Sequence, residues 1–213
     1  MTAPEGQGAL EFDQQTRASL TIFADLVEKW TKRINLISRA SAEAIWDRHI
    51  VDSAQLWPLV PASARKFVDL GSGGGFPGIV LALLARQRAA GCHMTLVESD
   101  QRKAAFLREA IRLSGAPASV ECARAEQVPP QEADVVSARA LAPLPDLLGL
   151  VSRHLAAGGV ALLPKGAGFQ AEITAAQDAW AFDLEVFPSQ TDSEARILRL
   201  CHLTRRTGST SPT

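Results

Sequence analysis

Apolar residues change their spacing along the chain, and the change divides it into two parts. Between residues 10 and 38 they recur at the intervals of an amphipathic helix, and residues 41–57 continue in the same way. Two prolines, Pro58 and Pro61, then interrupt the pattern. We therefore predict a helical N-terminal extension over residues 1–62.

From residue 63 onward, short apolar runs alternate with segments of helical periodicity. The expected buried strands are 65–71, 93–99, 118–124, 133–140 and 160–166, and the expected helices are 76–87, 100–115, 143–159 and 168–179. Two closing runs, 181–187 and 195–203, alternate with period two, which is typical of antiparallel edge strands. Such alternation predicts an α/β fold, with a Rossmann-like, seven-stranded, mostly parallel sheet over residues 63–204. A disordered tail is expected over 205–213.

Composition narrows the class of protein. The chain has 213 residues, of which 46% are hydrophobic, so one domain with a small appendage can bury a core. No apolar run is long enough for a membrane helix, and the first residues lack a secretory signal. The three cysteines are odd in number, far apart and without metal-like spacing. We expect a soluble, cytoplasmic, monomeric protein without a metal or a membrane partner.

The formal net charge of −1 argues mildly against a protein that coats nucleic acid. The basic residues are nevertheless clustered, in the N-terminal extension and again between residues 102 and 112. Each cluster is either a solvated helix face or a place where phosphate is contacted.

Three glycines, Gly71, Gly73 and Gly75, separate the first predicted strand of the sheet from its helix. In parallel sheets ligands bind outside this end of the strands, and glycine lets backbone approach a ligand closely. A phosphate loop would continue with Gly-Lys-Ser/Thr, but Phe76 and Pro77 follow here. A dinucleotide site would need a third small residue where Phe76 stands.

An acid before the glycines points to a different cofactor. Asp69 would repel pyrophosphate, but it suits the cationic sulfonium and amino groups of S-adenosylmethionine (SAM). Glu98 ends the second strand, where an acid can accept hydrogen bonds from both ribose hydroxyls. Sites for NAD use the same device, and a surface acid at a helix start is the alternative for Glu98. Together these residues favour a class I SAM-dependent methyltransferase.

Several stretches, in order along the chain, resemble one known family. They are "INLISR", "RHIVDS", "FVDLGSGGGFPGIVLA", "ESDQRKAAFL", "ARAEQ", "VSARALAPL" and "LLPKG". The family is the bacterial 16S rRNA guanine-N7 methyltransferases, called RsmG or glucose-inhibited division protein B (GidB). The resemblance implies methylation of N7 of guanine 527, in the loop around position 530 of 16S rRNA. It also implies that the partner is the small ribosomal subunit or its precursor.

The resemblance also implies roles for individual residues. Gly71 and Phe76 match SAM-binding positions, and Glu98 matches the acid at the ribose. Ala125 and Glu126 match the pair that holds adenine after the third strand.

Arg139 matches the arginine after the fourth strand and is the expected catalytic residue, in contact with both cofactor and substrate. Guanine N7 carries a lone pair and no proton, so it can attack the methyl group in line without a general base. We expect Arg139 to contact the guanine acceptor edge, a phosphate or the SAM carboxylate. The alternative is a structural salt bridge to an acid such as Asp69.

Five further residues are candidates for contact with RNA. Arg48, with Lys32 and Arg33, would meet phosphate. His49 either contacts the substrate or is a buried histidine bonded to Asp52 or to backbone. Lys165 is either a phosphate contact or a solvated lysine.

Two other functions remain open on the sequence. Near-neutral charge favours a small-molecule SAM-dependent methyltransferase, whereas a non-catalytic SAM-binding module would bind the cofactor without turnover. The basic N-terminal segment and the family resemblance favour the rRNA enzyme.

Overall fold

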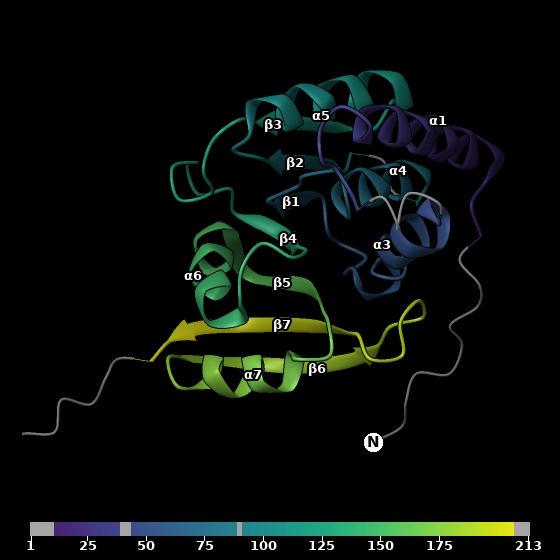
Figure 1. Ribbon diagram of the computed structural model, residues 1–213. Helices are drawn as coiled ribbons and strands as arrows, with labels where there is room; N and C mark the ends of the chain where they lie inside the picture. Colours follow the sequence, from purple (N-terminus) through teal and green to yellow (C-terminus); the bar gives the residue numbers. More distant parts are fainter. Residues whose placement is uncertain (1–10, 39–43, 89–90, 207–213) are drawn as a thin grey trace, which may run out of the picture.

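The computed structural model describes residues 11–38, 44–88 and 91–206, which form an α/β fold around one twisted sheet (Figure 1). Its seven strands have the order β3-β2-β1-β4-β5-β7-β6. The strands are β1 Lys66–Leu70, β2 His93–Val97, β3 Ala118–Glu121, β4 Ala133–Ala138, β5 Leu155–Lys165, β6 Trp180–Pro188 and β7 Arg196–Arg205. The first five are parallel, and β7 pairs antiparallel with both β5 and β6. The predicted mostly parallel sheet with two antiparallel closing strands is confirmed.

Helices cover both faces of the sheet, and each face has its own apolar core (Figure 1). On one face lie α1 Gln14–Thr31, α4 Gly78–Arg88 and α5 Gln101–Ser114; on the other lie α6 Leu144–His154 and α7 Phe169–Gln177. Capping follows the sequence closely at α5, where Asp100 accepts from the first backbone N–H groups and Gly115 ends the helix at φ 69°. Among the described residues, no helix is long and apolar enough to cross a bilayer.

The N-terminal extension is part of the same core. Helix α1 packs against α4 and α5, and its Phe23 ring lies 5.0 Å from the ring of Phe76 and 6.5 Å from that of Phe106. The aromatic contact therefore ties the extension to the turn after β1. Helix α1 is therefore one wall of the α/β fold and does not stand apart from it.

The predicted second helix, residues 41–57, is broken into three short pieces; its first three residues lie outside the described part. The pieces are a π-helical turn η1 Trp46–Val51, α3 Asp52–Ala54 and a 3₁₀ turn η2 Trp57–Leu59. Ser53 Oγ donates to the carbonyl of His49 at 2.6 Å, which competes with the regular backbone ladder. Pro58, which has no N–H, then prevents a regular continuation.

Two boundaries differ from those expected. Helix α6 ends at His154, not near residue 159, because Leu155 already pairs with Ala133 and the chain enters β5 through an irregular register. At the other end, β7 includes Arg205, and the backbone N–H of Arg206 donates to the carbonyl of Ala179 at 2.8 Å. The remainder of the predicted disordered tail, residues 207–213, lies outside the described part.

Candidate functional site

The turn after β1, residues 71–77, is held to the end of β2 by hydrogen bonds that its backbone N–H groups donate. Gly71 N–H donates to the carbonyl of Val97 at 2.9 Å, and Gly73 N–H donates to Glu98 Oε2 at 2.8 Å. The other oxygen of Glu98 accepts from the N–H of Asp100 at 2.7 Å. Each carboxylate oxygen keeps a second acceptor position, so Glu98 can still receive two ribose hydroxyls. The acid predicted to bind ribose thus also braces the turn.

Glycines in this turn are required by the protein's own side chains. Gly71, Gly73 and Gly75 all have positive φ, at 68°, 53° and 84°. A Cβ on Gly71 would lie 2.6 Å from Leu141 Cδ1, and one on Gly75 would lie 2.8 Å from Ile79 Cγ1. The close approach that the sequence suggested is real, but in this structure the approaching groups are internal.

Asp69 points into the core beneath the turn. It is fully buried, accepts a hydrogen bond from Ser137 Oγ at 2.7 Å and lies behind the turn, against Gly78. Burial raises the pKa of its carboxyl group to about 6, against the hydrogen bonds from Ser137 and Ser72 that lower it. Because Asp69 is buried and lines none of the described cavities, its position gives no support to the expectation that it contacts the cationic groups of a cofactor. Its side chain packs beneath the first turn of α4.

A small cavity of about 60 Å³ lies beyond the carboxyl ends of β1, β2 and β3. It is lined by Gly71, Val97, Ser99, Ala123, Arg124, Ala125, Glu126, Leu141 and Leu150. The fold thus brings together three residues predicted for SAM, namely Gly71, Ala125 and Glu126. The volume of this cavity is small for a nucleoside, and Leu141, which lies over Gly71, is a side chain whose movement would enlarge the cavity.

A large cavity of about 980 Å³ adjoins it, and Leu141 lines both. Four residues expected to act on substrate meet there: Arg48, His49, Arg139 and Lys165. They come from η1, from the end of β4 and from the end of β5, and the loop after β6, residues 189–195, closes the remaining side.

Arg139 lies at the centre of a packed polar cluster in this cavity. Its Nη1 is 3.0 Å from His49 Nδ1 and 3.4 Å from Asp52 Oδ2, and its guanidinium carbon is 5.4 Å from the Phe76 ring centroid. The His49 ring stacks on Phe76 at 4.9 Å. The acid that pairs with Arg139 is therefore Asp52, and not Asp69 as the structural alternative proposed.

Asp52 belongs to this cluster, although sequence reasoning mentioned it only as a partner of His49. Besides its ion pair with Arg139, its Oδ1 accepts from Gln55 at 2.9 Å and from Thr191 at 2.7 Å. It therefore joins the N-terminal segment, the loop after β6 and the end of β4. The sequence did contain one indication of this role, because residues three apart on a helix lie on the same face and Asp52 follows His49 by three.

The protonation state of His49 follows from its neighbours. Arginine can only donate, so Nδ1 of His49 is the acceptor and the neutral ring carries its proton on Nε2. Burial, followed by the charges of Arg139 and Arg48, lowers the pKa of His49 to about 4. Nε2 has no hydrogen-bond partner within the described part of the chain. A neutral histidine with an available donor thus stands beside Arg139.

Lys165 is not solvated. Its side chain is 9% exposed, and its ammonium group lies 2.8 Å from Glu172 Oε2 and 2.9 Å from the carbonyl of Ala142. Glu172 also accepts from the N–H of Leu144 at 2.7 Å. The pair fixes residues 139–143, the loop that carries Arg139 and Leu141. Sequence reasoning missed Glu172, which lies on α7.

Arg33 lies elsewhere. It lines a separate cavity of about 330 Å³ with Asn35, Asp100, Arg102 and Lys103. Lys32 is the C-terminal cap of α1, directly before it. The end of α1 and the start of α5 thus bring two basic clusters together, but not around Arg48.

Comparison with known proteins shows the family of the chain. A family model described as rRNA small subunit methyltransferase G (GidB) matches residues 16–197. The chain belongs to this family. The relative of that name in Cereibacter sphaeroides is 53% identical over 90% of this chain and 92% of its own. The one in Rhodospirillum centenum is 47% identical over 96% of this chain and 92% of its own.

Solved structures support the fold class. An O-methyltransferase from Bacillus cereus in complex with SAH shares the fold with a TM-score of 0.57 at 12% identity, covering 91% of this chain and 93% of its own. At this identity the likeness concerns the fold alone. The likeness confirms the class I SAM-dependent methyltransferase architecture that we predicted for this chain from its sequence.

Proposed function

We propose that the chain transfers the methyl group of SAM to N7 of guanine 527 in 16S rRNA, within the small ribosomal subunit or its precursor. The observation that carries the proposal is the pair of cavities that adjoin at Leu141. One has the residues for a nucleoside cofactor, and the other has cationic side chains and space for a base. Membership of the GidB family supports rRNA as the substrate class.

The cofactor would lie across the turn after β1. The adenine would enter the small cavity beside Ala125 and Glu126, the ribose would reach Glu98, and the methyl group would point toward the large cavity. SAM supplies an electrophilic methyl group on a sulfonium centre. For the ligand to enter, Leu141 must leave its place over Gly71.

The side chains present suit transfer to N7 because that atom has no proton to lose. No general base is then required, and the basic groups of the cluster are already engaged: His49 accepts from Arg139, and Asp52 pairs with Arg139 and accepts from Gln55 and Thr191. What remains for the protein is to hold the base in line with the methyl group.

Arg139 is suited to that positioning role. Asp52, His49 and the Phe76 ring hold its guanidinium group in one place before substrate arrives. Its remaining N–H groups can donate to the guanine acceptor edge, a phosphate or the SAM carboxylate. Arg139 must stay away from N7 itself, because methylation there creates a positive charge on the ring.

Contacts with RNA are divided between two places. Arg48 lies in the large cavity, whereas Arg33, Arg102 and Lys103 form a separate basic area at the start of α5 that can receive phosphate. Lys165 is bound to Glu172, so its proposed role is to hold the loop that carries Arg139.

The test uses SAM labelled in its methyl group and small subunits purified from cells that lack the modification. After incubation, the rRNA is digested and labelled nucleotides are mapped. We expect label in N7-methylguanine at one site, lost in Arg139→Ala and kept in Arg88→Ala, a control in which an exposed arginine at the C-terminal end of α4 is removed. Label in small metabolites instead would support the alternative small-molecule enzyme, and SAM binding without transfer would support a binding module.

A further inference from the structure

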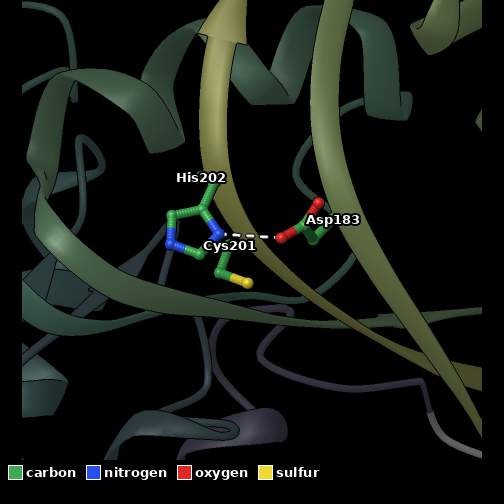
Figure 2. A group of neighbouring side chains, drawn as sticks. All are labelled: Asp183, Cys201 and His202. Atoms are coloured by element: carbon green, nitrogen blue, oxygen red, sulfur yellow. Dashed lines mark hydrogen bonds and ion pairs between the residues drawn. The ribbon is translucent and has the colours of Figure 1, made fainter.

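A second group of chemically reactive side chains lies on the last two strands. Asp183 projects from β6, and Cys201 and His202 project from β7 (Figure 2). Each offers one oxygen, sulfur or nitrogen, and these three atoms all lie within 4.8 Å of one another. His202 Nδ1 and Asp183 Oδ2 are 2.8 Å apart.

An irregularity in strand pairing makes the grouping possible. Asp183 pairs with Cys201 and Ala181 pairs with Thr204, so Phe182 stands opposite two residues of β7. Neighbouring residues of a regular strand point to opposite faces, but this β-bulge lets Cys201 and His202 both reach Asp183 (Figure 2).

The residue in the bulge is an unusual choice. His202 has φ 53°, a left-handed conformation that glycine adopts most readily, and the corresponding position in a common class of bulge is a glycine. At this position the chain has an imidazole, and the residue before it is a thiol. The backbone thus orients two side chains that ligate the same metals.

The three donors are of types that zinc prefers. Thiolate, imidazole and carboxylate bind Zn²⁺ at about 2.3, 2.0 and 2.0 Å, so donors around one ion lie roughly 3 to 4 Å from one another. The three atoms, all within 4.8 Å of one another, are thus close to the spacing that one ion requires. The ion would take the place of the Nδ1 proton that His202 donates to Asp183, and Cys201 would bind as thiolate, with its thiol proton released to solvent.

We propose that Asp183, Cys201 and His202 bind a divalent transition metal ion of the zinc type, with a fourth position open to solvent. The His202 and Asp183 side chains are 70% and 73% exposed, so an ion reaches them directly. The proposal runs against the expectation of no metal, which rested on cysteine spacing alone. Asp183 and Cys201 belong to different strands of a hairpin, and no spacing rule reveals their pairing.

The metal site is separate from the proposed methyl transfer. Lys165, at the large cavity, pairs with Arg196 at the beginning of β7, whereas Cys201 lies five residues further along that strand, roughly 17 Å away at the rise of a β-strand. The ion would therefore fasten the edge of the sheet and would not take part in the reaction. The two proposals fail or succeed independently.

The experiment uses the full, untagged chain, because a histidine tag would bind the same ions. Zn²⁺ is titrated by calorimetry, and Co²⁺ serves as a probe whose absorption reports a thiolate ligand. We expect one equivalent to bind, with a thiolate-to-cobalt charge-transfer band. Asp183→Asn should weaken binding by roughly tenfold or more. Removing only a hydrogen-bond partner of a metal ligand already costs about tenfold in affinity, and Asp183 would be a ligand itself.

Variants at the other two ligands separate a built site from surface binding. Cys201→Ser should remove the charge-transfer band, and His202→Gly, which suits the positive φ, should keep the fold and lose binding. Cys122→Ser and His93→Gln remove an exposed cysteine and an exposed histidine elsewhere on the chain. Both variants should keep the Zn²⁺ affinity and the charge-transfer band of the parent. Absence of binding, or binding unaffected by Cys201→Ser and His202→Gly, would overturn the proposal.

Discussion

Replacing Gly78 by alanine tests how closely helix α4 approaches the sheet below the candidate site. Gly78 is the first residue of α4. A Cβ there would lie 2.8 Å from Asp69 Oδ2 and 3.0 Å from Asp69 Cβ, and closer still to Leu96 Cδ2. Asp69 and Leu96 are both fully buried, so neither can turn away into solvent.

The magnitude follows from two opposing effects. Forcing an additional methyl group into a packed core costs about 1–3 kcal/mol, and contacts this short place Gly78→Ala near the upper end. Alanine is favoured over glycine in a helix by at most about 1 kcal/mol, and less in the first turn. We expect a net loss of about 2 kcal/mol in the free energy of unfolding, together with weaker SAM binding because Asp69 and the turn are displaced.

Urea denaturation followed by tryptophan fluorescence measures the change, with an unchanged m-value as the condition for comparing midpoints. Gly149→Ala is the matched control, since Gly149 is also in a helix but has no atom within 4 Å of the added Cβ. It should raise stability by about 0.5–1 kcal/mol. If Gly78→Ala were as stable as the parent, or if both variants lost the same free energy of unfolding, the packing argument would be refuted.

Three further predictions concern single residues of the site. Arg139→Ala should abolish methyl transfer while circular dichroism and the unfolding midpoint show a folded protein; near-normal turnover would reject its role. The folded pKa of His49 is about 4 against an ordinary 6.5, so the unfolded state takes up the proton first and stability falls as pH drops from 6.5 toward 4, by up to about 3 kcal/mol. His49→Gln should flatten that slope in urea midpoints measured across the range, and equal slopes would contradict the assignment. Leu141→Ala, which uncovers Gly71, should tighten SAM binding in calorimetry; weaker binding would mean that Leu141 holds the ligand.

Local patterns predicted the elements of the fold because local chemistry determines them. Asp100 and Gly115 mark the ends of α5 by hydrogen bonding and left-handed geometry that the residue types impose. Where distant partners decide, the same reasoning failed. Leu155 follows a helical pattern, yet it begins β5 because Ala133 on the neighbouring strand is available to pair with it.

The site was predicted in its residue types more than in its contacts. The strand-end location of Glu98 and Arg139 follows from topology, but which acid meets Arg139 depends on how η1 packs against the end of β4. Asp69 lies on β1 and Arg139 directly follows the neighbouring strand β4, so the sequence made Asp69 the expected partner of Arg139. The fold turns Asp69 into the core and brings Asp52 across from the N-terminal segment.

Leu141 forms a wall of both cavities, and this shared wall couples their occupancy. If a ligand displaces Leu141 from Gly71, the wall that this side chain forms in the large cavity moves as well. The loop that carries it is tethered at Ala142 by Lys165, which restricts how far it travels. Under the proposed function, binding of the cofactor would therefore alter the cavity that receives the substrate.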